Sequence, residues 1–312
     1  MKTMDICGKP LSAMTIGTVQ LGMNYGIANT GGQPDQAKSF AMLRAAFENG
    51  ITALDTARAY GNSEEVIGAF LKTWEGERPH ITTKIPTYGD RDPAGLEKHM
   101  IESVETSLQT LGVDRVDAIM LHNVVDLYTH GEKAAKVMEN ILKKGYTSQV
   151  GVSVYTGEDV TEMLRYEPYT VTQVPMSIFD QRLIASGQTQ QLKERDYTVF
   201  VRSVFLQGLF FLDPDGITDP ILLEHAAPKI RTLRQIANAE GMTVAQLAIA
   251  FMRDTVGVTS LVLGADTPEQ VKENIAYFDA PILSESVMAT LREEFAQVDI
   301  PEIMKVLSRP KK

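Results

Sequence analysis

The stretch D-Q-A-K-S-F-A-M-L-R-A-A-F-E-N-G at residues 35–50, followed directly by I-T-A-L-D at 51–55, sets the pattern for the whole chain. Its first part places Phe40, Leu43 and Phe47 at three- and four-residue spacing, which predicts an amphipathic helix that stops at its closing glycine. Its second part is a short apolar run, typical of a strand buried on both faces. A helix that leads into a buried strand is the repeating unit of α/β folds.

Seven further apolar runs repeat the strand half of this unit. They are S-A-M-T-I-G at 12–17, H-I-T-T-K at 80–84, D-A-I-M-L-H at 117–122, Q-V-G-V-S at 149–153, T-V-T-Q at 170–173, T-V-F-V-R-S at 198–203 and S-L-V-L-G at 260–264. Helical patterns accompany them at 63–72, 93–111, 131–144, 157–166, 228–240, 243–254, 268–278 and 284–297, with Thr243 and Ser284 as expected N-caps.

Eight strands that alternate with helices predict an α/β fold, a (β/α)8 TIM barrel with extra helices, although a doubly wound open sheet would give a similar string. No linker rich in Pro or Ser divides the chain, so we expect a single domain over residues 1–312. The segment at 204–227, after the seventh strand, lacks clear periodicity. It predicts a long loop, and loops of this length are usually lids or binding loops.

Composition and charge restrict the classes of function. The chain carries 40 Asp and Glu against 30 Lys and Arg, a formal net charge of −10, which argues against binding to nucleic acid or to an anionic membrane. Cys7 is the only cysteine, so an intramolecular disulfide is impossible and a reducing compartment is expected. The chain starts without a hydrophobic signal core and has no long apolar run, which predicts a cytoplasmic protein without a membrane span.

Polar side chains end successive apolar runs, where the active site of a parallel barrel lies. Asp55 closes the second run, Lys84 the third and His122 the fourth, and Tyr60 lies five residues past Asp55. Each alone has an ordinary explanation, since an Asp before a helix is usually a cap, a Lys is usually solvated and a Tyr usually packs. Their placement on one rim favours a shared role, because a barrel mouth brings the ends of adjacent strands together.

These four residue types suit carbonyl chemistry. A Tyr hydroxyl has a reference pKa of about 10, and a neighbouring ammonium such as Lys84 favours the phenolate and is expected to lower that pKa. Asp55 would keep Lys84 charged, and a neutral His122 could hydrogen-bond a carbonyl oxygen beside Tyr60. The set offers an acid and an oxyanion site without a nucleophile or a metal, which suits reduction by hydride from a bound cofactor.

The stretch L-D-T-A-R-A-Y-G-N-S-E-E-V-I-G at 54–68 resembles the signature of the aldo-keto reductase family. Further matches follow in the family's order, at T-T-K 82–84, L-H-N 121–123, G-V-S 151–153, T-Q-V-P 172–175, R-S-V-F-L-Q-G 202–208 and L-G-A-D-T-P-E-Q-V-K-E-N 263–274. The resemblance covers nearly the whole chain. It implies an NAD(P)-dependent oxidoreductase that transfers hydride between the cofactor and a small-molecule aldehyde, ketone or sugar carbonyl, or the corresponding alcohol.

The resemblance also implies individual roles. Asp55, Tyr60, Lys84 and His122 would be the catalytic tetrad, with Tyr60 as general acid in reduction and general base in oxidation. The implied cofactor-binding residues are Ser153 and Gln173 at the nicotinamide carboxamide, Gly17 and Thr18 below the ring, Ser203, Phe205, Gln207 and Gly208 around the pyrophosphate, and Gln270, Glu273 and Asn274 at the adenosine end.

Several positions depart from the family's pattern. Val154 stands where Asn or Arg is frequent, and Arg202 stands where an aromatic usually stacks on the nicotinamide, although a planar guanidinium can stack as well. Gly264, Ala265 and Asp266 replace residues that often bind a 2′-phosphate. A carboxylate repels phosphate but accepts hydrogen bonds from ribose hydroxyls. These residues therefore favour NAD(H) over the NADPH that the family usually binds.

Other residues and readings stay open. Met23, Tyr25, Asn123 and Tyr155 follow strand ends and are expected to line the substrate pocket. Arg58 could meet an anionic substrate, but a surface role is the more ordinary explanation. The chain could also be a cofactor-binding regulator with a reductase fold and little turnover, or a barrel aldolase with a Schiff-base lysine, which would leave the cofactor motifs unexplained. No metal site is expected from the spacing of the histidines, and the oligomeric state is left open.

Overall fold

The computed structural model describes residues 1–27, 29 and 31–309 and confirms a closed barrel. Eight parallel strands close in the order β10-β3-β4-β5-β6-β7-β8-β9. Their bounds are β3 Met14–Gly17, β4 Ala53–Asp55, β5 His80–Ile85, β6 Ala118–Leu121, β7 Gln149–Ser153, β8 Tyr169–Pro175, β9 Thr198–Arg202 and β10 Ser260–Leu263. The alternative of an open doubly wound sheet is therefore wrong.

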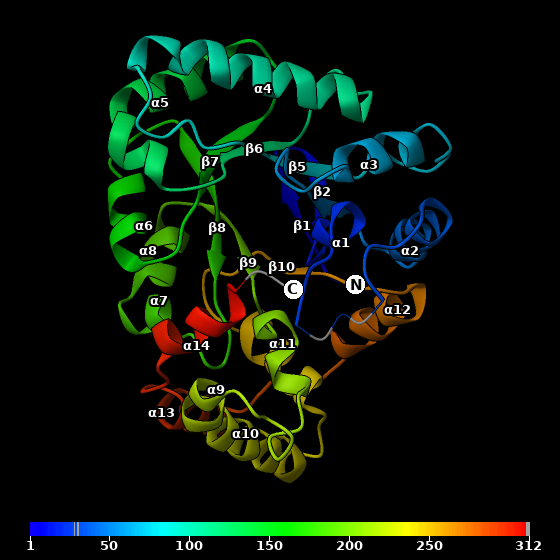
Figure 1. Cartoon of the computed structure of the whole chain (residues 1–312), viewed down its shortest axis with the longest axis vertical. Coiled ribbons are helices and arrows are strands. Elements are labelled where there is room, and N and C mark those ends of the chain that lie inside the picture. Colours follow the sequence, from blue (N-terminus) through cyan, green and yellow to red (C-terminus); the bar gives the residue numbers. More distant parts are fainter. Residues whose placement is uncertain (28, 30, 310–312) are drawn as a thin grey trace.

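Helices surround the strands (Figure 1). Those that match sequence expectations are α2 Gln36–Glu48, α3 Ser63–Leu71, α4 Leu96–Leu111, α5 Val125–Lys143, α6 Gly157–Met163, α10 Ala227–Ala239, α11 Val244–Arg253, α12 Pro268–Tyr277 and α13 Glu285–Glu294. Both predicted N-caps are confirmed, because the Thr243 and Ser284 side chains accept hydrogen bonds from backbone N–H groups of the first turn. In the described part of the chain, no helix combines the length and the apolar character that a membrane span needs.

The structure adds elements that hydrophobic periodicity did not predict. They are strands β1 Thr3–Ile6 and β2 Lys9–Ser12, helices α1 Val19–Gly22, α7 Arg182–Ala185, α8 Gln188–Glu194, α9 Pro220–His225 and α14 Ile300–Leu307, and the 3-10 helix η2 Leu206–Phe211, whereas the 3-10 helix η1 Pro93–Gly95 lies in the predicted helix at 93–111. Each spans about two helical turns or fewer, or a few strand residues, which is too short for a clear period. The segment at 204–227, expected to be a loop, thus contains η2 and α9.

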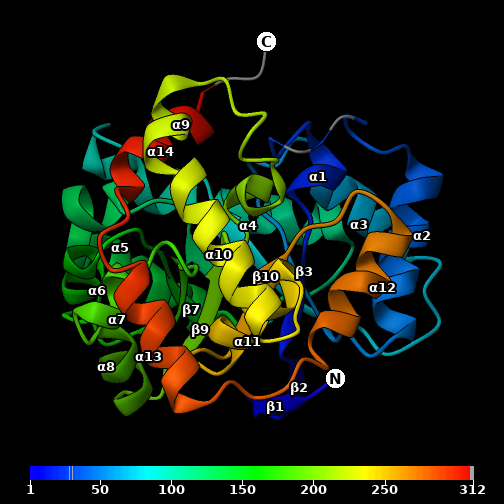
Figure 2. The ribbon, with the colours of Figure 1, turned by 90° about the horizontal axis from the view of Figure 1, so that it is seen from below.

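The barrel interior is a filled core that the hairpin β1-β2 closes from below. Ala53, Met120, Val171 and Phe200 form one buried cluster with Leu11 of β2. Because these residues come from β4, β6, β8 and β9, which are not all neighbours in the sheet, their side chains meet across the barrel axis. Figure 2 shows β1 and β2 at the end opposite α1 and α9. The hairpin therefore covers the barrel interior at its amino end, with a cavity at its edge lined by Lys9, His80, Asp117 and Gln149 among others.

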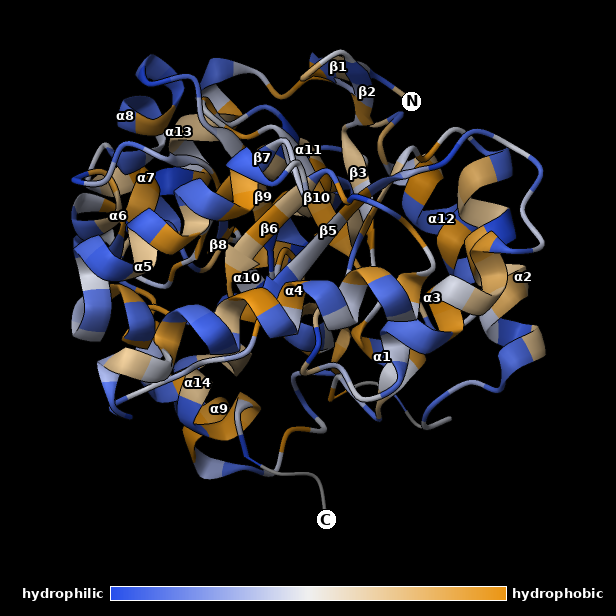
Figure 3. Cartoon of the chain, turned by 90° about the horizontal axis from the view of Figure 1, so that it is seen from above, coloured by the Kyte–Doolittle hydropathy of each residue, from blue (hydrophilic) through white to orange (hydrophobic). Residues whose placement is uncertain are grey.

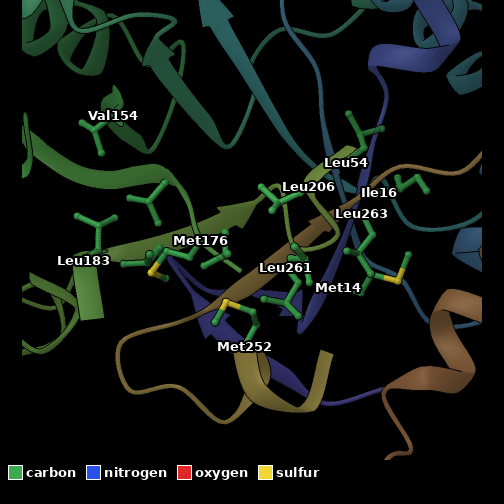
Figure 4. Packing of buried hydrophobic residues seen from close by; sticks show 14 of the residues in the cluster. Met14, Ile16, Leu54, Val154, Met176, Leu183, Leu206, Met252, Leu261 and Leu263 are labelled. Atoms are coloured by element: carbon green, nitrogen blue, oxygen red, sulfur yellow. The ribbon is translucent and has the colours of Figure 1, made fainter. Parts of the chain in front are cut away.

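The alternate strand residues face outward and pack against the helices. Met14 of β3 and Leu261 of β10 lie with Met252 of α11 in one buried cluster, as the close view in Figure 4 shows. In Figure 3 apolar strands occupy the centre, and the helices around them carry alternating hydrophobic and hydrophilic patches. The active site of a parallel barrel lies at the carboxyl ends of its strands, which is the end that the hairpin leaves uncovered.

Candidate active site

The interior row of strand residues continues into the mouth of the barrel. Side chains two positions apart on a strand point to the same face, so the residues two positions after the interior cluster also point inward. On β4, β8 and β9, and just past the end of β6, these residues are Asp55, Gln173, Arg202 and His122. On β5, His80 contacts Phe200 inside the barrel, and Lys84 four positions later shares its face.

The Lys84 ammonium is held inside the mouth. Its Nζ donates to Asp55 Oδ1 at 2.6 Å and to the Thr56 carbonyl oxygen at 3.0 Å, and lies 3.5 Å from Tyr60 Oη. Burial alone would lower the pKa of Lys84, but the attraction of Asp55 and Tyr60 outweighs it and holds that pKa above its ordinary value. Lys84 therefore stays charged beside the Tyr60 hydroxyl.

The acidity of Tyr60 differs from the sequence expectation. Burial raises the pKa of Tyr60, and this effect exceeds the opposing attraction of Lys84 and Arg202. The expectation that Lys84 brings the net pKa below its ordinary value is thus wrong for the chain in this state, because sequence spacing does not show how deeply the phenol is buried. Near neutrality the hydroxyl is protonated, which is the state that a proton donor needs.

His122 lies edge-on to Tyr60, with ring centroids 5.5 Å apart and an interplanar angle of 81°. Burial, together with the charges of Lys84 and Arg202, lowers the pKa of His122 to about 4. The imidazole is therefore neutral at pH 7, as expected, and can donate one N–H to a carbonyl oxygen. The mouth thus combines a protonated phenol, a neutral imidazole and a paired ammonium. Such an ammonium has no lone pair for Schiff-base attack.

Gln173 and Thr18 fix Asp55 from two sides. Gln173 Nε2 donates to Asp55 Oδ1 at 2.7 Å, and the Thr18 hydroxyl donates to the Asp55 carbonyl oxygen at 2.8 Å. Gly17 is the register partner of Asp55, and Ser153 is that of Gln173. The structure therefore brings these four expected cofactor-binding residues to the same mouth as the tetrad. Their contact with a nicotinamide stays a prediction.

The loop after β9 has a strained backbone. Ser203, Leu206 and Gln207 have φ values of 64°, 46° and 57°, and Gly208 has 95°; positive φ is uncommon for non-glycine residues and clusters at functional sites. The N–H groups of Leu206 and Gly208 donate within the loop, to the carbonyl oxygens of Ser203 and Phe205 at 2.8 and 3.0 Å. Binding of a phosphate group by this loop stays a prediction. The expected pyrophosphate residues, including Phe205 at the N-cap of η2, all lie in this loop.

The expected adenosine-end residues lie around the start of α12. The Asp266 N–H donates to Gln270 Oε1 at 2.7 Å, and Asn274 Nδ2 donates to the Gly264 carbonyl oxygen at 3.2 Å. Glu273 is exposed on the same helix. The exposed side chains of Gln270 and Glu273 offer hydrogen-bonding groups to a ribose, and their contact with a cofactor stays a prediction.

Two residues near the start of α12 were not predicted. Gln20 lies against Gly264, where an added Cβ would come within 2.1 Å of Gln20 Nε2, and Gln20 Oε1 is buried without a hydrogen-bond partner in the described part of the chain. Asn29 donates to Asp266 Oδ1 at 3.2 Å. A close approach at glycine and an unpaired buried acceptor fit a site that receives a ligand. A single sequence carries no signal for either contact, because each joins β3-side residues to the far end of the chain.

The sequence model of the aldo/keto reductase family matches residues 13–294, from the first barrel strand to the end of α13. The chain belongs to the aldo/keto reductase family. It is 26% identical to an L-glyceraldehyde 3-phosphate reductase from Escherichia coli O157:H7, over 94% of this chain and 90% of the relative. Among solved structures, an aldo-keto reductase from Bacillus halodurans in its holo form superposes with a TM-score of 0.79 at 22% identity, covering 94% of this chain and 96% of the other. An aldo-keto reductase from Klebsiella pneumoniae in complex with NADPH has a TM-score of 0.69 at 24% identity, with 92% of both chains covered.

In this aldo-keto reductase, Arg202 occupies the mouth beside the loop after β7. Its Cζ lies 4.6 Å from the ring centroid of Tyr155, and its Nη2 lies 3.4 Å from the Val154 carbonyl oxygen. The Tyr25 hydroxyl, in the loop after α1, interacts electrostatically with the side chains of Arg202, Tyr60 and Tyr155. The predicted lining residues Tyr25 and Tyr155 are therefore grouped at the mouth.

Other candidates have structural partners. Arg58 pairs with the buried Glu64 at 3.2 Å, so its side chain stabilises the start of α3. The Asn123 side chain accepts from the Val125 N–H at the start of α5. Met23 is exposed after α1. Within the described residues, no group of three His, Cys, Asp or Glu side chains could hold a metal ion.

Proposed function

We propose that the chain, as one catalytic domain over residues 1–312, is an NAD(P)(H)-dependent oxidoreductase that interconverts a small aldehyde, ketone or sugar carbonyl with its alcohol. The observation that carries this proposal is the arrangement around Lys84, whose Nζ lies 2.6 Å from Asp55 Oδ1 and 3.5 Å from Tyr60 Oη. A neutral His122 lies edge-on to Tyr60 beside them. Family membership supplies the reaction class, and this geometry supplies groups suited to it.

The residues of the mouth would divide the work of carbonyl reduction. Tyr60 Oη and one His122 ring N–H would donate hydrogen bonds to the carbonyl oxygen, which polarises the carbonyl and positions it. As charge develops on that oxygen, Tyr60 would transfer its proton, and the Lys84 ammonium would stabilise the phenolate left behind. Asp55, held by Gln173, would keep Lys84 charged. A bound nicotinamide cofactor would supply the hydride.

We further propose that NAD(H) binds at least as tightly as NADP(H). The 2′-phosphate would approach Asp266, whose carboxylate repels it, while Gly264 and Ala265 bring no side-chain donor. The Asp266 carboxylate already accepts a hydrogen bond from Asn29, and in the same way it can accept one from a ribose hydroxyl. The Klebsiella pneumoniae aldo-keto reductase was solved in complex with NADPH. The preference of this chain between NAD(H) and NADP(H) therefore needs a direct binding measurement.

The test of the reaction is Tyr60→Phe. Because it removes the proton donor and keeps the ring, reduction of a simple aldehyde should fall by about 10²- to 10⁴-fold, while the Kd of the cofactor stays nearly unchanged. Tyr146→Phe is the matched control, since Tyr146 bonds Glu105 on the surface before β7, at the opposite end of the barrel. If Tyr60→Phe kept more than about a tenth of the wild-type rate, Tyr60 would lose the role of acid.

A further inference from the structure

Arg202 is half-buried at the mouth, where its side chain has defined contacts. It follows the buried Phe200 by two positions on β9, so its side chain belongs to the inward row. The guanidinium stacks over Tyr155 at 4.6 Å and is 3.4 Å from the Val154 carbonyl oxygen. Stacking and a backbone contact hold the charge in place while leaving further N–H donors of the fork available.

The two cations of the mouth are balanced differently. Lys84 has Asp55 at 2.6 Å. Arg202, in contrast, has no carboxylate within ion-pair distance among the described residues. With His122 neutral, the described mouth therefore carries one uncompensated positive charge in a chain whose formal net charge is −10.

The charge of Arg202 reaches the place where a carbonyl would react. Burial is the largest influence on the pKa of both Tyr60 and His122; Lys84 and, more weakly, Arg202 add an electrostatic lowering of each. Hydride transfer requires the donor carbon roughly 3–3.5 Å from the carbonyl carbon, whose oxygen in the proposed function lies on Tyr60 and His122. Whichever face the nicotinamide ring presents, it would sit within the field of Arg202.

The two redox forms of the ring respond differently to that field. The oxidised nicotinamide carries a positive charge, whereas the reduced ring is neutral, so a fixed cation repels one form and leaves the other nearly unaffected. We infer that Arg202 makes this enzyme bind reduced cofactor in preference to oxidised cofactor, so that the oxidised cofactor is released more readily after carbonyl reduction. This inference rests on the proposed function, because it needs a nicotinamide in the mouth.

The size of the effect follows from charge separation. Two unit charges roughly 8 Å apart, at an effective dielectric constant of about 20, repel by an energy equivalent to about 30-fold in affinity. Screening by salt weakens interactions of partly exposed charges beyond about 8–10 Å. Arg202 should therefore contribute about 10- to 30-fold to the ratio of the Kd of oxidised to reduced cofactor at low salt.

The test measures binding without turnover. Purified protein free of cofactor is titrated with NADH, NAD⁺, NADPH and NADP⁺ by calorimetry, for wild type, Arg202→Met and Arg202→Lys. Arg202→Met should reduce the Kd ratio of oxidised to reduced form by about 10- to 30-fold, mainly through tighter binding of the oxidised form. Arg202→Lys keeps the charge and should keep most of the ratio. Arg91→Met is the matched control, because Arg91 also stacks on a tyrosine, Tyr88, at 4.1 Å.

Each outcome decides the inference. If Arg202→Met weakened or strengthened both redox forms equally, Arg202 would act only by stacking, and the inference would be overturned while the proposed function stood. If Arg202→Lys lost the ratio as fully as Arg202→Met, the charge would not be its cause. If neither redox form bound the wild-type protein, the proposed function would fail together with the inference.

Discussion

Replacing Asp55 by Asn should leave the Lys84 ammonium buried without its counter-charge, and so should test the ion pair at the centre of the site. Lys84 is 1% exposed and Asp55 is 3% exposed, with 2.6 Å between Nζ and Oδ1. The same carboxylate oxygen accepts from Gln173 Nε2 at 2.7 Å. An amide oxygen could still accept a hydrogen bond but would bring no charge to balance the ammonium.

The magnitude follows from that distance. Opposite unit charges 2.6 Å apart attract by about 6 kcal/mol at an effective dielectric constant of about 20. Much of this attraction offsets desolvation, and breaking a buried pair by removing one partner usually costs about 3–5 kcal/mol. We expect Asp55→Asn and Lys84→Met each to lower the free energy of unfolding by that amount at pH 7. The double variant, which leaves no unpaired charge, should recover most of it.

The pH dependence has a definite sign. In the wild type the pKa of Lys84 is raised, so the stability from its pairing is fully present below the unfolded value of about 10.4 and is lost as pH rises through the folded pKa. In Asp55→Asn, burial without a partner lowers the pKa of Lys84. Its ammonium then loses the proton at lower pH, and the deficit of the variant relative to wild type should narrow as pH rises towards 10.

Urea unfolding of the wild type, both single variants and the double variant, at pH 7 and pH 9.5, measures this coupling. Asp215→Asn is the control, because Asp215 pairs with Arg231 on the surface, where such pairs contribute little. Strictly additive losses, within about 0.5 kcal/mol, would show that Asp55 and Lys84 do not act as a pair. That result would remove the basis for a permanently charged Lys84 beside Tyr60.

Two further predictions concern acid pH and the cofactor. The pKa of His122 is lowered to about 4 in the folded chain, whereas an unfolded histidine is protonated near pH 6.5. Because only the unfolded chain binds this proton between those pH values, the free energy of unfolding should fall as pH drops from about 6.5 to 4. His122→Gln should flatten this part of the stability profile in urea titrations, and an NMR titration midpoint of His122 above about 6 would contradict the assignment. Asp266→Ser should shift affinity towards NADP(H), because it removes the carboxylate that faces a 2′-phosphate. Tenfold tighter binding of NADPH than of NADH by the wild type, measured by direct titration, would instead refute the NAD(H) proposal.

The strands and the catalytic candidates could be predicted because both depend on local pattern. Buried parallel strands are apolar on both faces, so each barrel strand appears as a short run, and the residue that ends a run must lie at the mouth. Asp55, Lys84 and His122 end such runs. Their closeness also depends on barrel closure, a global property that eight strand and helix units favour but share with an open doubly wound sheet, and that the structure establishes.

Other features depend on contacts that no local pattern encodes. Residues 3–5 of β1 are exposed, so the strand has no buried face to produce alternation. Leu206 adopts a positive φ without being Gly or Asn, the residues that would have indicated one. The net pKa of Tyr60 depends on how deeply the phenol is buried, which its position five residues after Asp55 does not show.

The mouth shows why residue type alone does not determine what a cation does there. Lys84 and Arg202 are both inward-facing residues at the carboxyl ends of strands, but only Lys84 has a carboxylate at contact distance. Lys84 still acts on its neighbours Tyr60 and His122, but Asp55 offsets its charge at longer range. Arg202, stacked on Tyr155, keeps its net charge and can act over the longer range that a ring redox change would sense. The positions of the carboxylates on neighbouring strands therefore decide which cation serves proton transfer and which affects the redox state of the bound cofactor.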